Sequence, residues 1–436
     1  MREMSNTIKG LLFCILLGLL LLPLIQNKFK CITLMPLKGA IIESEKKYIN
    51  APDWFSGNYQ LQEEKYLNET FGFRTFFIRL NNQIAFSLFN KAKANGVICG
   101  KDNYLFEVNY MNAYYGTDFI GIDSITQRIE KLKFIQDTLR KLNKTLVVVF
   151  SAGKGSYYPE YFPKEYIRTK GKTNYDYHVK LAKQYGLNYI DFNNYFVENK
   201  NKSKYPLYPK YGIHWSTYGA SLAADSMIKY IEKVRNISMP HIFWNDVALE
   251  DAKGTDYDIG DGLNILTTLK GPKMAYPVIQ VQSDSGKMKP SAIVVADSYY
   301  WLMFGNTFTK ALSHNQFWYY NKQVYSDDNQ NELETSQLNL NDEIQKHDVF
   351  IIMATEATLP NLGWGFIENT YNLFKGIHND PLLDADFQRK IVNLRNYINS
   401  DKNWMEQIKK KAVSKKISVD SMITIDAIWE IKHEKK

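Results

Sequence analysis

The sequence predicts an α/β protein with a mostly parallel sheet, because short apolar runs alternate with longer amphipathic segments. Three runs, at 146–150, 291–296 and 349–354, have the continuous apolar character of strands that are buried on both faces, and 188–192 is a further predicted strand. Apolar side chains with helical spacing mark the segments at 125–143, 175–185 and 219–234. This alternation favours a doubly wound sheet that is covered by helices on both faces.

The composition is that of an ordinary globular protein. The 436 residues are 45% hydrophobic and 23% charged, with a net charge of +8 that is spread along the chain. No helix-turn-helix, zinc-finger or RNA-binding signature is present, so we do not expect nucleic acid as a partner. The cysteines Cys14, Cys31 and Cys99 form neither a zinc pattern nor a disulfide framework, and no glycine-rich loop suits a nucleotide, so no metal and no cofactor is expected.

An apolar run at the N-terminus predicts a membrane anchor. It extends from Gly10 to Ile25 and follows Arg2 and Lys9. A helix needs ~20 apolar residues to span a bilayer, and residues flanking this run can extend it to that length. No small-x-small cleavage site follows, so we expect an uncleaved signal anchor, with a cleaved signal peptide as the alternative. The downstream chain is water-soluble in character, which predicts a tethered soluble domain.

The pattern divides the chain into four parts. These are an anchor over 1–30, a lead-in segment over 31–120 that packs on the main domain, the main domain over 121–385, and a short helical tail over 386–436. A polar stretch at about 236–288 is read as an insertion in the main domain. The lead-in segment is expected to hold a turn at 53–57, helices at 59–67 and 74–90, and a hairpin at 97–106.

A serine follows the third predicted strand directly. Active groups collect at the carboxyl ends of strands in open α/β sheets, and Asp297 and Ser298 occupy that position. A helix that begins at Tyr299 would direct backbone N–H groups toward the serine, where they suit a developing oxyanion. The alternative is that Asp297 or Ser298 only caps this helix.

A histidine that could activate this serine lies in a loop before a predicted helix. A serine hydroxyl needs a general base at neutral pH, and His214 in Gly212-Ile213-His214-Trp215-Ser216 is the candidate. The rival base is His314, which follows Ser298 in the chain. A surface or capping role is the alternative for a loop histidine.

Several short motifs, taken in order, resemble the AlgX/AlgJ-type alginate O-acetyltransferases. The lead-in motifs are Trp54 to Gln60, Glu69 to Arg74 and Gly100 to Phe106. The later motifs are Phe150 to Lys154 with Tyr158-Pro159, the pair His214-Trp215, the run Ala296-Asp297-Ser298, and the strand ahead of Glu356. The matches span roughly 54–356, and it is their order that makes them specific.

The resemblance implies an SGNH-hydrolase-like three-layer sandwich with Ser298 as nucleophile and His214 as base. It further implies transfer of acetyl through an acyl-serine to an exported polysaccharide, with the acetyl group supplied by a membrane-bound O-acyltransferase partner. Such a protein would be held in a bacterial inner membrane by its N-terminal anchor, with the soluble domain in the periplasm or extracytoplasmic space. A carbohydrate acetylesterase with the same site, or a non-catalytic polysaccharide-binding or scaffold protein of an export complex, are the alternatives.

One departure from the family concerns the acid that orients the histidine. The family motif is Asp-x-His-Trp, and Gly212 stands at the position of the aspartate. Asp191 and Glu356 are possible substitutes, and a dyad or an inactive site is also open. Asp297 is grouped with the catalytic residues, although a side chain next to the nucleophile normally points away from the base.

Four residues are candidates for binding substrate. Lys154 follows a buried strand on the side where Ser298 is expected and could hold an anionic sugar, unless it is a surface lysine. Trp215, Tyr299 and Glu356 are the others, and aromatic side chains there could equally pack the core. A carboxylate within hydrogen-bond reach of His214 would favour an enzyme over a scaffold.

Overall fold

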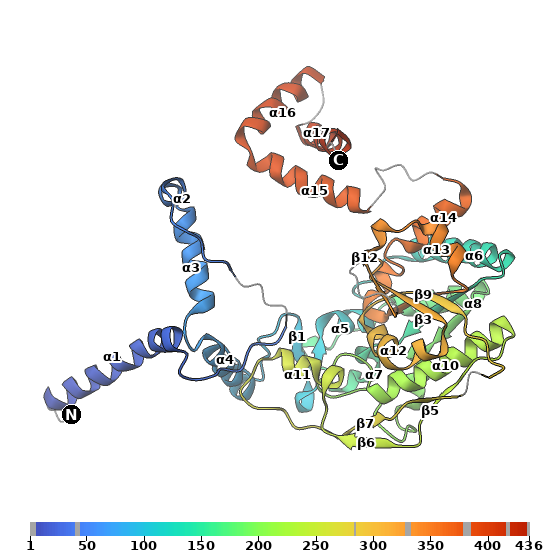
Figure 1. Cartoon of the computed structure of the whole chain (residues 1–436), viewed down its shortest axis with the longest axis horizontal. Helices are drawn as coiled ribbons and strands as arrows, with labels where there is room; N and C mark the ends of the chain where they lie inside the picture. Colours follow the sequence, from blue (N-terminus) through green and yellow to red (C-terminus); the bar gives the residue numbers. More distant parts are fainter. Residues whose placement is uncertain are drawn as a thin grey trace.

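A seven-stranded sheet forms the centre of the computed structural model, which describes residues 6–39, 44–282, 285–327, 333–377, 385–415 and 419–433 (Figure 1). In spatial order the strands are β12 (Leu333–Glu334), β11 (Gln323–Ser326), β10 (His314–Tyr319), β9 (Ser291–Ala296), β13 (Val349–Thr355), β3 (Thr145–Ser151) and β4 (Tyr189–Asp191). The strands from β10 to β4 are parallel, and β11 and β12 add an antiparallel edge. The predicted mostly parallel sheet is therefore confirmed.

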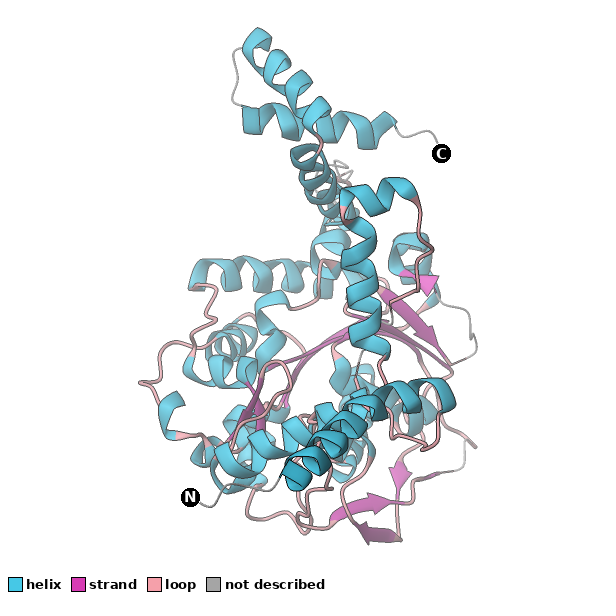
Figure 2. Ribbon diagram, turned by 90° about the vertical axis from the view of Figure 1, so that its left-hand side faces the viewer, coloured by secondary structure: helices cyan, strands magenta, loops and turns pink. Residues whose placement is uncertain are grey.

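Helices cover both faces of this sheet (Figure 2). Side chains alternate along each strand. Val147 and Val149 of β3 join the core beneath α10 (Thr217–Arg235), whereas Val148 joins the opposite core. That second core contains apolar side chains of α6 (Ile122–Lys141), α8 (Asn174–Gln184) and α14 (Phe366–Lys375). The result is the three-layer sandwich that the resemblance implied.

The parallel register places the ends of three central strands at one edge. Met353 of β13 lies opposite Ala296 of β9, and Ala354 lies opposite Phe150 of β3. The segments that follow these strands therefore meet beyond the same edge. Ser298 follows β9, and β13 lies between β9 and β3 in the sheet.

Two features differ from the sequence prediction, and the other elements of the lead-in segment agree with it. His314 begins strand β10, which the analysis of apolar runs missed. The predicted turn at 53–57 belongs mostly to helix α2 (Ala51–Ser56), whose first turn is capped by the Asn50 side chain. Helices α3 (Asn58–Thr70) and α4 (Arg74–Phe89) and the hairpin β1 (Val97–Cys99) to β2 (Leu105–Glu107) lie where they were expected.

The two ends of the chain are helical. Within α1 (Asn6–Phe29), the stretch Ile8–Phe29 is apolar and long enough to cross a membrane, with a mean hydropathy of 2.6. Residues 1–5 of the predicted anchor lie outside the described residues. At the other end, α15 (Ala385–Ser400), α16 (Lys402–Lys415) and α17 (Val419–His433) pack on one another, which confirms a helical tail (Figure 1). The domain boundaries stay predictions.

The predicted insertion consists of small β ladders and a short helix. Strand β6 (Val247–Glu250) pairs with β7 (Met274–Pro277), and β5 (Ile242–Phe243) pairs with β8 (Gln280–Val281). Helix α11 (Asp258–Gly262) lies between β6 and β7 in the chain. Its Gly260 N–H donates to the carbonyl of Tyr211 at 2.9 Å, so the insertion is fastened to the loop that leads into α10.

Candidate active site

The structure brings Ser298 and His214 into hydrogen-bond contact. Ser298 begins the short 3₁₀ helix η5 (Ser298–Tyr300) immediately beyond β9, as its position after a buried strand predicted. His214 lies in the loop before α10, whose first turn is capped by Ser216. His214 Nε2 lies 2.9 Å from Ser298 Oγ. A neutral imidazole in this position accepts the serine proton, which is the arrangement for nucleophilic catalysis.

Asp258 completes the group. Its Oδ2 lies 2.6 Å from His214 Nδ1, while its Oδ1 accepts the N–H groups of Ile213 and Ile259 at 2.9 and 2.7 Å. One carboxylate oxygen of Asp258 therefore binds the imidazole, and the other accepts the backbone N–H groups that fix the position of the side chain. A carboxylate on Nδ1 selects the tautomer whose Nε2 is free to accept a proton, and it stabilises the imidazolium that results. The three side chains have the geometry of a Ser-His-Asp triad.

Asp258 was not among the candidate acids predicted from the sequence. The surroundings of Gly212 explain why the acid does not stand two positions before His214. A Cβ atom at Gly212 would come within 2.4 Å of the Thr255 carbonyl oxygen. The backbone of η4 (Gly254–Tyr257) thus fills the space that a side chain at position 212 would need. The same segment continues directly into Asp258. The carboxylate is supplied from the insertion, in place of the residue two positions before the histidine.

Asp256 fastens this segment to α10. Its side chain is fully buried and accepts the N–H and the hydroxyl of Thr217 at 3.1 and 3.3 Å. Burial raises the pKa of Asp256 to about 6, and the hydrogen bonds from Thr217 oppose that rise. Two aspartates of this short segment therefore bind the chain around His214. Asp256 binds Thr217 at the start of α10, and Asp258 binds the His214 imidazole.

Asp297 points away from the histidine, as is usual for the residue before a nucleophile. Its Oδ1 accepts the Tyr299 N–H at 3.1 Å, and its Oδ2 accepts the Thr355 N–H and the Thr358 hydroxyl at 2.9 and 2.7 Å. Asp297 therefore caps η5 and ties the Ser298 turn to the end of β13. The Tyr299 N–H, which we expected to face the reacting carbonyl, is occupied by this cap.

Lys154 is buried beneath the site. The side chain has no exposed surface, and its Nζ donates to the carbonyl oxygens of Lys210 and Gly212 at 2.9 and 2.6 Å. Burial lowers the pKa of Lys154 to about 7. The ammonium group is directed at the backbone of the loop that carries His214, and Lys154 is not among the residues that line the pocket. The structure therefore places it where it supports that loop.

Trp215 and Tyr299 are buried and brace the same loop against the Ser298 turn. The Trp215 indole donates to the Tyr299 carbonyl at 3.2 Å, and the Tyr299 hydroxyl donates to the Ile213 carbonyl at 2.6 Å. Neither ring lines the pocket. The core-packing alternative is the one that their contacts support.

Glu356 and Asp191, the two expected substitutes for the acid, form their hydrogen bonds elsewhere. Glu356 Oε1 accepts the Ser156 hydroxyl and the Asn193 amide at 2.7 and 2.9 Å, and burial raises the Glu356 pKa to about 7. Asp191 accepts the Tyr175 hydroxyl at 2.9 Å and caps α9 (Phe192–Asn199). Asp191 ends β4 and Glu356 follows β13, as expected, but both side chains serve the packing of the layers.

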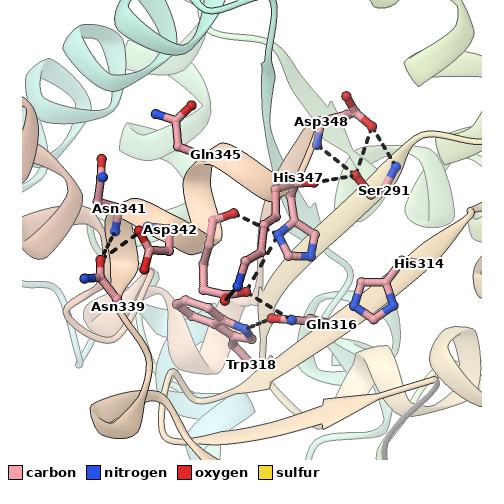
Figure 3. A network of polar contacts seen from close by, with 12 residues as sticks. Ser291, His314, Gln316, Trp318, Asn339, Asn341, Asp342, Gln345, His347 and Asp348 are labelled. Atoms are coloured by element: carbon pink, nitrogen blue, oxygen red, sulfur yellow. Dashed lines mark hydrogen bonds and ion pairs between the residues drawn. The ribbon is translucent and has the colours of Figure 1, made fainter.

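The rival base His314 lies at the opposite end of the sheet. It begins β10 opposite Ser291, the first residue of β9, whereas Ser298 follows the last residue of β9. His314 pairs with Asp327 at 2.8 Å, and its ring stacks on His347 with centroids 5.5 Å apart. Figure 3 shows His314 and His347 beside Ser291. This histidine therefore cannot reach Ser298.

A cavity of about 360 Å³ opens over the serine. Its size lies within the range of small-molecule sites. Besides the three triad residues, its polar and aromatic walls are formed by Glu107, Asn109, Tyr110, Asp297, Tyr320 and Thr358. The Tyr320 phenol is close enough to interact with Ser298, and Tyr320 has a positive φ of 49° at the end of β10. No group of three or more metal-ligating side chains occurs in the residues that the structure describes.

Comparisons with known proteins agree with the motifs. Residues 97–280 match the family described as "SGNH hydrolase-like domain, acetyltransferase AlgX", which confirms the resemblance over this segment. The matched segment contains His214 and Asp258 and ends before Ser298. No curated protein sequence matches the chain.

Several solved structures are similar to this chain, each with low sequence identity. The O-acetyltransferase domain of Pseudomonas putida AlgJ is 16% identical, with a TM-score of 0.43, over 64% of this chain and 99% of that one. Pseudomonas aeruginosa AlgX is 14% identical, with a TM-score of 0.39, over 63% and 67%. Bacillus cereus PatB1 with a sulfonyl adduct is 11% identical, with a TM-score of 0.42, over 62% and 99%.

The geometry predicts that Asp258 controls the reactivity of Ser298. In the full chain purified in detergent, Asp258→Asn should slow the labelling of Ser298 by a sulfonyl fluoride by about 10²-fold or more, because the amide loses the charge that orients and stabilises His214. Labelling is followed by the mass of the intact protein. Asp261→Asn, an exposed aspartate of the same helix, should react at the parent rate.

The same assay tests the explanation for Gly212. Adding Gly212→Asp to Asp258→Asn should fail to restore labelling, since the new side chain would collide with the Thr255 carbonyl. Equal labelling of Asp258→Asn and the parent would contradict the assignment of the acid. Recovery in the double variant would contradict the steric argument.

Glu356 predicts a pH-dependent stability. Its folded-state pKa is about 7 and the ordinary value is 4.5, so the folded chain binds a proton that the unfolded chain releases between these values. The free energy of unfolding should therefore fall by up to roughly 3 kcal/mol as pH rises from 4.5 to 7. Glu356→Gln should flatten this slope in denaturant unfolding at several pH values, whereas Glu165→Gln, at an exposed glutamate, should keep it. Equal slopes for Glu356→Gln and the parent would exclude this role.

Proposed function

We propose, from the AlgX-type SGNH hydrolase-like domain that residues 97–280 carry, that this chain is an O-acetyltransferase which modifies an exported polysaccharide through an acyl-serine intermediate. The observation that carries the proposal is that His214 bridges Ser298 and Asp258, at 2.9 and 2.6 Å. A triad of this kind, set in an open cavity, is suited to acyl transfer.

In the first half-reaction, His214 Nε2 accepts the Ser298 proton while Oγ attacks the acetyl carbonyl of the donor. The tetrahedral oxyanion is held by donors beside Ser298, for which its own backbone N–H at the start of η5 is the candidate. The imidazolium then gives its proton to the leaving group of the donor, and acetyl-Ser298 remains. Asp258 keeps the imidazolium oriented between these two proton transfers.

In the second half-reaction, a sugar hydroxyl takes the place of the leaving group. His214 accepts the hydroxyl proton as the oxygen attacks the acetyl-serine carbonyl, and the proton returns to Ser298 Oγ when the ester breaks. The products are an O-acetylated sugar and the free serine. Water in place of the sugar would give ester hydrolysis, so the two reactions differ only in the acceptor.

The apolar helix α1 supports a location at a membrane. The stretch Ile8–Phe29 would tether the chain, with the catalytic domain outside the cytoplasm where an exported polymer passes. In this proposal the anchor lies in a bacterial inner membrane, the domain is periplasmic, and a membrane-bound O-acyltransferase supplies the acetyl group. The presence of Asp258 beside His214 favours this catalytic proposal over a non-catalytic scaffold.

The proposal predicts that ester turnover depends on both triad partners. With the full chain in detergent and p-nitrophenyl acetate as donor, Ser298→Ala and His214→Ala should each lower kcat/KM by about 10³-fold or more. Ser226→Ala, a remote serine on α10, should leave the rate unchanged. Mass spectrometry of added oligosaccharides would then detect acetylated sugar and separate transfer from hydrolysis. A parent rate equal to that of Ser298→Ala would contradict the proposal.

A further inference from the structure

We propose that helix α4 (Arg74–Phe89) lies on an anionic lipid surface, with its exposed apolar face in the interfacial layer of the membrane that α1 would cross. The inference goes beyond the proposed acetyl transfer, and it rests on the membrane location proposed for α1. It is based on the two faces of α4, on the contact between α1 and the turn before α4, and on the charges of the surrounding segment.

One face of α4 is apolar and exposed. Phe77, Ile84 and Leu88 follow one another at intervals of seven and four residues, so they lie on the same side of the helix. Their side chains are 45, 45 and 72% exposed, and the neighbouring Phe76 and Phe89 are exposed as well. Large apolar side chains that adjoin one another at a surface mark an interaction site.

The opposite face of α4 is fixed to the catalytic domain. The Arg79 guanidinium donates to the Ile265 carbonyl at 3.0 Å, and the Asn82 amide donates to the Leu263 carbonyl at 2.9 Å. These carbonyls follow α11, the helix that begins with Asp258. The helix therefore keeps its apolar face outward, and a surface that binds this face is held in a fixed orientation to the triad.

The turn before α4 packs closely against the apolar helix α1 (Figure 1). A Cβ atom at Gly72 would lie 2.1 Å from the Pro23 carbonyl oxygen and 2.7 Å from the Asn27 backbone nitrogen. Only a glycine permits this approach of the two backbones. The membrane-spanning candidate and the start of α4 are therefore held together at this point.

This contact sets the depth at which α4 begins. At 1.5 Å per residue, Pro23 stands about 9 Å before the end of the apolar stretch Ile8–Phe29. When α1 crosses a bilayer, the turn therefore lies at the depth of the lipid headgroups. Phe77 stacks on Phe71 in that turn, with ring centroids 6.5 Å apart, so the apolar face of α4 begins at the membrane surface. Lipid is thus the partner that the position of α1 brings to this face.

The charges around α4 suit anionic lipid. Segment 70–101 contains no acidic residue. Its basic residues are Arg74, Arg79, Lys91, Lys93 and Lys101. Lys91 and Lys93, which follow the end of α4, are exposed. A surface helix with an apolar face and basic neighbours is drawn to an anionic bilayer by burial of apolar area and by charge together.

The test measures whether Leu88 contacts lipid. Leu88 lies about 24 Å along α4 from Gly72, so a tether through α1 alone does not bring it to the bilayer. The full chain with Leu88→Cys, Cys14→Ser, Cys31→Ser and Cys99→Ala is labelled with nitrobenzoxadiazole and reconstituted into vesicles of phosphatidylcholine and phosphatidylglycerol. Doxyl-labelled phosphatidylcholine should lower the emission by at least about half, because the label would lie within the lipid. Glu165→Cys in the same cysteine background, at an exposed residue of the catalytic domain, should keep its emission.

Further variants test what holds α4 at the lipid. Adding Phe77→Asn and Ile84→Asn to the Leu88→Cys chain should reduce the quenching at least about twofold, since apolar area is lost from the docked face. Lys91→Glu with Lys93→Glu should act in the same direction through charge. Ile167→Asn, at an exposed apolar residue outside α4, should leave the quenching unchanged.

A label on the native Cys14, with Cys31 and Cys99 replaced, reports separately on α1. Quenching at Cys14 without quenching at Leu88→Cys would overturn the inference, since α1 would then cross the bilayer while another partner covers α4. Unchanged quenching after Phe77→Asn and Ile84→Asn would overturn it too. Absence of quenching at Cys14 would overturn the membrane location and the inference together. The proposed acetyl transfer is tested by Ser298-dependent turnover in detergent, so its failure is distinguishable from these outcomes.

Discussion

The contact between His214 and Asp258 is the interaction on which the site depends, because it joins the end of the loop before α10 to a segment of the insertion. This contact does not stand alone. Gly260 donates to Tyr211, Asp258 accepts from the Ile213 backbone, and Asp256 accepts from Thr217. The insertion is thus hydrogen-bonded to the chain before His214, to the His214 side chain itself and to the chain after it. Together these hydrogen bonds hold the imidazole toward Ser298. A triad requires this kind of support, since small errors in orientation weaken proton transfer.

Much of the fold could be predicted from the sequence for reasons that are local. Buried parallel strands read as continuous apolar runs, and the residue after such a run has a known place at the sheet edge. Ser298 became a candidate in this way, with a capping role as the alternative, and the order of the motifs in the resemblance then selected Ser298 and His214. Strand β10 was missed because His314 to Tyr319 mixes polar and aromatic residues as it approaches the antiparallel edge. Asp258 was missed because the docking of its segment is a tertiary contact, and nothing in its spacing separates it from the neighbouring Asp256 and Asp261.

Lys154 and Glu356 show that the position of a residue after a central strand does not by itself predict whether its side chain faces the site. Both follow central strands at the correct edge, and both were expected to face a substrate. Each side chain instead turns into the packed layers, where Lys154 binds loop carbonyls and Glu356 binds Ser156 and Asn193. Burial shifts their pKa values in opposite directions, toward neutrality for each group. The direction of a side chain one to three residues beyond a strand is decided by the packing partners, which the sequence does not reveal.

The contact between Asp258 and His214 bears directly on the proposed reaction. In that reaction, positive charge develops on His214 as Ser298 attacks, and the Asp258 carboxylate beside Nδ1 stabilises this charge. The position of Asp258 depends on the packing of the segment that carries it, which Asp256 and Gly260 bind to the loop around His214. The fold of the insertion and the proposed reactivity of the serine therefore have a common physical origin.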